Sequence, residues 1–297
     1  MAKEKKVVIG VLNVTMQPHS PEKYLELFRD TYKLRRPANI AGDSYGLLSA
    51  MAKVERYQEE PGPLTGDIFK FTQIDKNADW FDTSANDFAS EDQLGKINIP
   101  DNLKPNSSRF TYIFYPKEHL FFYEAYYDGN SFGPTNMERF VSRLFQQEEI
   151  EKIYGKIDVT HVPAVDTLVD ALKIPRKERI DIFVKRPNPD DHAEAERRVM
   201  ERMNARNIES FEQSYKVVPG QSIEVDEELE TMAHIAAKNG SFAIKGKDHR
   251  SKPISYSTKQ HPYTVTEYYD PDGELVFDLL STITTQLKSS IAEWFRK

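Results

Sequence analysis

Basic side chains gather in two stretches of this 297-residue chain, although the chain as a whole carries a net charge of −7. Between Lys173 and Arg206 ten basic residues stand against seven acidic ones, and between Lys245 and Tyr263 five stand against one. The second stretch also holds small and hydroxyl-bearing residues, namely Gly246, Ser251, Ser255, Tyr256, Ser257 and Thr258. Lysines, hydroxyls and backbone amides bind phosphate oxygens. A local basic face is compatible with an acidic total charge, because what matters is where the positive charges cluster.

These stretches supply the residues that we predict to contact nucleic-acid phosphates: Lys185, Arg186, Arg197, Arg198, Lys245, Lys247, Arg250, Lys252 and Lys259. The competing interpretation of residues 245–259 is a plain solvated loop. No recognition helix and no zinc module stands out in the sequence, so low sequence specificity is expected.

Catalytic chemistry has no comparable signature. The seven histidines form no HExxH motif, and we expect His119, in a hairpin turn, to be solvated. The chain contains no GxGxxG, P-loop or GxSxG motif, and the absence of cysteine excludes disulfides, thiol catalysis and cysteine-based zinc sites. We therefore predict no catalytic residues, no metal and no cofactor.

An acidic stretch near residues 75–101 is the one candidate for metal-dependent chemistry. It contains Asp75, Asp79, Asp82, Asp87, Glu91 and Asp92. Carboxylates bind divalent cations, but an Asp…Glu-x-Lys spacing after a strand is missing here. A solvated surface connection is the preferred interpretation, and a metal-dependent nuclease is kept as the alternative function.

The secondary structure that must position these residues is easiest to predict at residues 109–145. Two aromatic, β-branched runs are separated by Pro116-Lys117-Glu118-His119, which is typical of a hairpin. The turn at residues 132–135 leads to apolar residues with helical spacing, at Met137, Phe140, Val141, Leu144 and Phe145.

The rest of the chain alternates short strands with amphipathic helices. We expect strands at residues 7–14, 50–57, 66–74, 156–163, 179–184, 241–244 and 262–269. Helices are expected at residues 21–34, with Ser20 as N-cap, and at 165–172, 190–207, 226–238 and 274–296. Residues 146–155 are expected to be a charged linker formed by the tail of the helix before it. The fold class is therefore α+β, with antiparallel sheets, packed amphipathic helices and a long C-terminal helix. We predict two domains, residues 1–155 and 156–297.

The last helix carries an apolar stripe formed by Leu275, Leu279, Ile283, Leu287, Ile291 and Trp294. Phe277, Leu280 and Phe295 widen it, which favours a second partner. We predict a homodimer whose interface includes Leu287, Ile291, Trp294 and Phe295. The alternative is a helix buried in its own domain.

Three segments carry a family resemblance: Phe132-Gly133-Pro134-Thr135 with the strands before it and the helix after it, the strand Ile180–Lys185, and the ending Ile291–Lys297. They resemble the RexA-like exclusion proteins of lambda-like phages and the KwaB-like proteins of Kiwa systems, over about half of the chain from Arg109 onward. The N-terminal third is closer to uncharacterised bacterial families. The resemblance implies a dimer that binds duplex DNA without sequence preference in defence against phage, and it carries over no catalytic residues.

The expected function is therefore a sequence-independent nucleic-acid-binding protein, with duplex DNA as the first ligand, that acts as sensor or effector in antiviral defence. A defence-system partner protein and, as a third reading, a protein–protein adaptor role stay open. The N-terminal apolar run is too short for a signal peptide, and no run approaches about 20 apolar residues. We therefore expect a cytoplasmic protein without membrane insertion.

Overall fold

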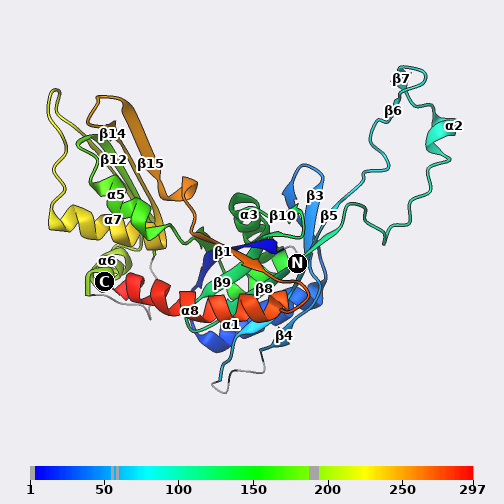
Figure 1. Cartoon of the computed structure of the whole chain (residues 1–297), viewed down its shortest axis with the longest axis horizontal. Helices are drawn as coiled ribbons and strands as arrows, with labels where there is room; N and C mark the ends of the chain where they lie inside the picture. Colours follow the sequence, from blue (N-terminus) through cyan, green and yellow to red (C-terminus); the bar gives the residue numbers. More distant parts are fainter. Residues whose placement is uncertain (1–3, 55–56, 58–59, 187–193, 297) are drawn as a thin grey trace.

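The computed structural model describes residues 4–54, 57, 60–186 and 194–296, and it confirms the α+β class (Figure 1). The larger of its sheets is antiparallel, with strand order β11-β1-β9-β8-β5-β3-β2, and β10, β16 and β4 pair with β9, β1 and β5. The strands are β1 (Lys5–Met16), β2 (Ala38–Ala41), β3 (Ser44–Leu48), β4 (Ala52–Lys53), β5 (Leu64–Thr72), β8 (Ser108–Tyr115), β9 (Leu120–Tyr127), β10 (Asn130–Ser131), β11 (Ile157–His161) and β16 (Thr264–Tyr269).

Helices cover both faces of this sheet. Alternate side chains of a strand point to opposite faces, so one strand contributes to the packing on each side. Phe110, Tyr112 and Phe114 of β8 share a core with α1 (Pro21–Leu34), α3 (Pro134–Phe145) and α4 (Glu148–Tyr154). Ile113 and Tyr115 of the same strand point to the other face, where they pack with α8 (Val276–Arg296). The predicted strand–turn–strand–helix unit is thus confirmed as β8, β9 and α3.

Helix starts follow the local signals of the sequence. The Ser20 hydroxyl accepts a hydrogen bond from the Lys23 amide at 3.2 Å, which confirms the predicted N-cap of α1. The segment at 146–155 is helical over most of its length, but it forms a separate helix, α4, instead of the expected tail of α3, and its Ile150 is buried in the core. Of the strand expected at 50–57, residues 55 and 56 lie outside what the structure describes, and among the others only the two residues of β4 form a strand.

A smaller antiparallel sheet has the order β13-β12-β14-β15. Its strands are β12 (Arg176–Lys185), β13 (Ser210–Lys216), β14 (Gly240–Lys247) and β15 (Pro253–Ser257). Three helices share a core with the buried side chains of these strands: α5 (Val165–Leu172), α6 (Glu194–Ala205) and α7 (Glu227–Asn239).

The predicted loop at residues 245–259 is a β-hairpin followed by a 3-10 turn, η1 (Thr258–Gln260). The carboxylate of Asp248 closes the hairpin by accepting hydrogen bonds from the Arg250 and Lys252 amides at 2.8 and 2.9 Å. The strand expected at 241–244 is the first half of β14, whereas β15 was missed: three of its five residues are exposed and only Tyr256 is buried, so no apolar alternation marks it.

The C-terminal part of the chain returns to the larger sheet. Residues 5–10 of β1 pair with β16, and residues 12–16 of the same strand edge pair with β11. Tyr269, Leu280 and Ile291 lie in one apolar cluster with Val7 and Ile113. The two predicted domains therefore share a sheet, and the division at residue 155 stays a prediction.

An arm protrudes between β5 and β8 (Figure 1). It carries β6 (Phe81–Asp82), β7 (Asp87–Phe88) and a one-turn helix, α2 (Glu91–Leu94). Most of its residues are exposed, in agreement with the predicted surface connection. Among the described helices, none has the length and apolar character needed to span a bilayer.

Candidate nucleic-acid interface

One face of the smaller sheet is free of helices in the part of the chain that the structure describes. Ile180, Ile182 and Val184 of β12 point to the helix-covered side, where α5, α6 and α7 bury them. The side chains between them must therefore point to the other side, because the strand alternates. On the neighbouring strands β13 and β14, every second side chain points to the same open face, and most of these side chains are polar.

Three cationic residues stand in register across the open face. Lys216 of β13 pairs with Arg179 of β12, Arg179 pairs with Lys245 of β14, and Lys245 pairs with Ser255 of β15. We call Lys216, Arg179 and Lys245 the cationic row. Neighbouring strands lie about 4.8 Å apart, so the row places the backbones of three cationic residues within about 10 Å of one another.

The members of the row differ in their partners. The Arg179 Nε group donates to both carboxylate oxygens of Asp181, at 2.9 and 2.8 Å, and the Ser214 hydroxyl donates to the same carboxylate at 2.7 Å. Burial alone would raise the pKa of Asp181, but these hydrogen bonds outweigh it and hold the pKa below its usual value. Lys216 and Lys245 are exposed and form no ion pair with another described residue.

A shallow depression of about 400 Å³ lies beside the cationic row. Its wall includes Arg179, Phe183, Ser214, Ser241 and Lys259. The wall also includes the carboxylates of Asp181, which is bonded to Arg179, and Glu212. Its cations and hydroxyls are groups that bind phosphate, and its aromatic ring can stack on a base.

Several residues predicted from the sequence lie on this face or at its rim. Lys245 is in the row, and Lys247 lies further along β14, with its ammonium 3.4 Å from a Glu178 carboxylate oxygen. Arg250 and Lys252 occupy the exposed β14–β15 turn, and Lys259 lines the depression from η1.

Other predicted residues lie elsewhere. Arg197 and Arg198 are on α6, on the helix-covered side of the sheet, where each forms an (i, i+4) ion pair with a glutamate of the same helix. Arg186 lines a separate depression and donates to the Ile208 carbonyl at 3.1 Å. Lys185 lies at the edge of the open face and contacts Asp158 at 2.5 Å. The predicted residues therefore do not form one surface.

The predicted dimer residues of α8 pack against their own chain. Ile291 is 5% exposed, and Leu287 and Trp294 are half-buried against the same core. The side chain of Phe295 lies outside what the structure describes. The homodimer stays a prediction, and Ile291 offers little surface to a second copy.

Residues 5–285 match a protein family described as a domain of unknown function, DUF4747. The chain belongs to the DUF4747 family. No curated protein matches the chain. No named relative therefore supports the resemblance to RexA-like and KwaB-like proteins, which stays an expectation for this DUF4747 member.

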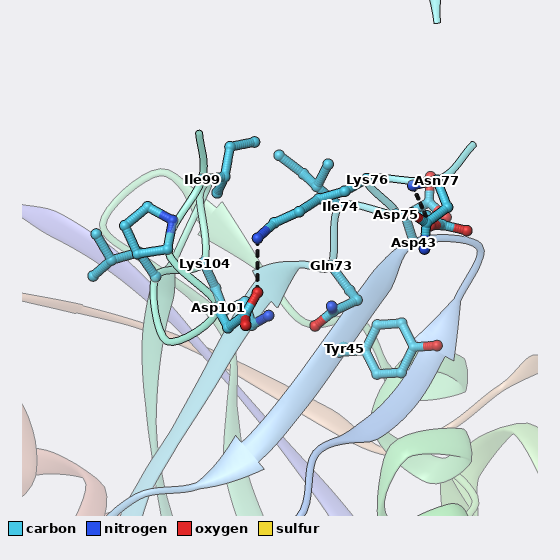
Figure 2. A pocket seen from close by; sticks show the side chains of 12 residues that line it. Asp43, Tyr45, Gln73, Ile74, Asp75, Lys76, Asn77, Ile99, Asp101 and Lys104 are labelled. Carbon is cyan, nitrogen blue, oxygen red and sulfur yellow. Dashed lines mark hydrogen bonds and ion pairs between the residues drawn. The ribbon is translucent and has the colours of Figure 1, made fainter. Parts of the chain in front are cut away.

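The acidic stretch of the arm meets the larger sheet at a cavity of about 440 Å³ (Figure 2). Lys76 bonds to Asp101 at 2.7 Å across its opening, and the Asp75 carboxylate accepts the Asn77 amide at 2.9 Å. Asp82 accepts the Ser84 amide at 2.7 Å. Most of these carboxylates cap turns, and no group of three or more candidate metal ligands occurs among the described residues.

His119 corrects an expectation drawn from the sequence. We expected a solvated side chain, but it is 1% exposed, and its ring stacks on Tyr24 of α1 with centroids 5.1 Å apart. Burial, together with the smaller effect of the nearby His19, lowers the pKa of His119 to about 2. The hairpin turn was expected at the surface because nothing in its sequence shows that α1 packs over it.

Proposed function

We propose that this protein binds nucleic acid through its phosphates, on the open face of the smaller sheet and without sequence preference. The observation that carries the proposal is the cationic row, in which Lys216, Arg179 and Lys245 stand in register across three strands. An acidic protein that concentrates basic residues on one uncovered face attracts polyanions to that face. Phosphate contacts of this kind carry no sequence information.

Duplex DNA is the first expected ligand, and anti-phage defence is the expected setting. Both rest on the resemblance to RexA-like and KwaB-like proteins rather than on the chemistry of the face. The exposed turn with Arg250 and Lys252 extends the basic surface beyond the row, so that a ligand longer than the sheet width gains further contacts.

The salt dependence of binding tests this proposal. Each phosphate neutralised on duplex DNA contributes about −0.9 to the slope of log K against log salt concentration. We expect the triple variant Lys216→Gln, Lys245→Gln, Lys252→Gln to bind more weakly and to flatten this slope by about 2–3 units. Fluorescence anisotropy with a labelled duplex of random sequence, over a series of salt concentrations, measures both quantities.

Arg197→Gln with Arg198→Gln is the matched control. It removes positive charge of the same kind from the helix-covered side of the same sheet, on α6. We expect affinity and slope close to those of the wild type. If this control reduces the slope as much as the triple variant does, the contact is not made by the open face and the proposal is wrong.

A further inference from the structure

A small cavity lies where the open face of the smaller sheet meets β11 and α3 of the larger one. Its volume is about 90 Å³, and its wall includes Glu138, Thr160, His161, Lys185, Thr258 and Lys259. Phe183 and Lys259 line both this cavity and the 400 Å³ depression on the open face. The depression and the cavity therefore adjoin. We call it the end pocket.

The imidazole of His161 is held in a defined orientation in the wall of the end pocket. Its Nε2 atom lies 2.6 Å from a Glu138 carboxylate oxygen, and the side chain is 6% exposed. Its Nδ1 atom is buried and has no hydrogen-bond partner among the described residues. A buried polar atom without a partner destabilises the folded protein, so a bound group that supplies a partner is favoured.

Cations and a hydroxyl complete the wall. The Lys185 ammonium contacts Asp158 at 2.5 Å, which uses one of its three donors. Lys259 is exposed and forms no ion pair with another described residue. The hydroxyl of Thr258, buried at 4% exposure, accepts the Phe242 amide at 3.1 Å and keeps its own proton to donate. The donors suit an anion with several oxygens.

Size decides which anion enters. A water molecule needs about 10–15 Å³ of such volume, so 90 Å³ accommodates a few waters or one compact group. A nucleoside with its base and sugar is too large, whereas a phosphate at the end of a strand fits. A terminal phosphate monoester also carries a charge of about −1.5 to −2 at pH 7, more than a diester within the strand.

We propose that the end pocket receives the terminal phosphate monoester of a nucleic-acid strand bound on the open face. This inference rests on the proposed function and deepens it: the protein distinguishes strands with phosphorylated ends from strands without them. In this arrangement Lys185, Lys259 and Thr258 donate to the phosphate, and His161, as the imidazolium, donates its Nδ1 proton to it while its Nε2 proton bonds to Glu138. The Glu138 carboxylate, bound to the ring, fixes its orientation.

The test compares the wild-type protein on ligands that differ only at their ends. Linear oligonucleotides with a 5′-phosphate, a 3′-phosphate or hydroxyl ends are measured beside a covalently closed circle of the same length and sequence. Hydrogen bonds to a charged group are stronger than those between neutral groups, so we expect one phosphorylated end to improve affinity about tenfold or more. Inorganic phosphate, at matched ionic strength, should remove that advantage and leave binding of the circle unchanged.

Two variants separate phosphate recognition from a structural role. His161→Gln should reduce the advantage of the phosphorylated end to about twofold or less, and it should leave binding of the circle unchanged. Glu138→Gln removes a negative charge from the wall, so it should keep or increase the advantage; a merely structural pair would lose it in both variants. His249→Gln, in the exposed β14–β15 turn, is the matched control.

The outcomes distinguish the two proposals. If the wild type binds the circle but shows no preference for either phosphorylated end, the end pocket is not a phosphate site and the proposed function stands. If neither circle nor linear strands bind, the proposed function fails and the pocket inference fails with it. Because these results need only the wild-type protein, they hold even if a variant does not fold.

Discussion

At the scale of single residues, Glu124 is a carboxyl group that the fold holds away from water. It lies on β9 at 1% exposure, where one carboxylate oxygen accepts the Thr111 amide at 2.7 Å. The other oxygen has no partner among the described residues. Burial raises the pKa of Glu124 to about 7, although the bond from Thr111 opposes the shift.

This shift predicts the sign of a stability change with pH. The pKa is higher in the folded state than the ordinary value of 4.5, so the folded state binds the proton more tightly. The contribution of Glu124 to the free energy of unfolding is therefore fully present below about pH 4.5, and it is lost as the pH rises through about 7. At 1.36 kcal/mol per pKa unit, the loss amounts to about 3 kcal/mol at the most.

Urea unfolding of the wild type and of Glu124→Gln at pH 5 and pH 8 measures this loss. We expect the wild type to lose up to about 3 kcal/mol relative to the variant between the two pH values. Glu267→Gln, which makes the same change at an exposed position of β16, is the matched control. Parallel pH profiles for the wild type and Glu124→Gln would show that the buried carboxyl does not titrate in this range.

At the scale of elements, the arm between β5 and β8 is the segment that contributes least to the core. Its ends meet where the Thr72 amide donates to the Pro105 carbonyl at 2.9 Å. Its large side chains Phe81, Phe88 and Leu103 are 61%, 70% and 58% exposed. Side chains of the arm bond to one another, as in the Ser90–Gln93 capping box of α2.

Removing the arm should therefore leave the rest of the fold intact. Replacing residues 75–104 by a four-residue Gly-Ser link shortens the loop about eightfold, and each halving lowers the closure cost by about 0.6 kcal/mol. We expect the free energy of unfolding to stay the same or to rise by up to about 2 kcal/mol. Thermal and urea unfolding measure it, and a loss of cooperative unfolding would mean that the arm stabilises the sheet below it.

At the scale of the whole molecule, β16 and α8 join the end of the chain to its beginning. β16 pairs with the edge of β1, and α8 covers the sheet face that carries Val7, Ile113 and Phe122. α8 also reaches the smaller sheet's core, because Trp294 packs against both clusters. Figure 1 shows α8 running from the larger sheet toward α6.

A fragment of residues 1–155 tests what this connection contributes. It lacks β11, β16 and α8, so it leaves one edge of β1 unpaired and exposes an apolar sheet face. Such edges and patches promote aggregation. We expect the fragment to aggregate or to bind the dye ANS strongly, unlike the full chain. A soluble fragment that unfolds cooperatively would instead support the division at residue 155.

Local features of the sequence determined the element types. The 3.6-residue spacing of Met137, Phe140 and Leu144 indicated α3, and Ser20 before Pro21 indicated the start of α1. The basic composition of residues 245–259 also showed where positive charge gathers. These features were readable because each depends on neighbours within a few residues along the chain.

Only the tertiary structure decided which residues meet. Lys216, Arg179 and Lys245 form one row because three strands pair in a particular register, and a shift of one residue would turn each side chain to the other face. His161 meets Glu138 because β11 and α3 pack together. Arg197 and Arg198, close to the row along the chain, lie behind it because α6 packs on the covered face. Pairing and packing of distant segments, which local composition does not encode, separated these residues from the open face.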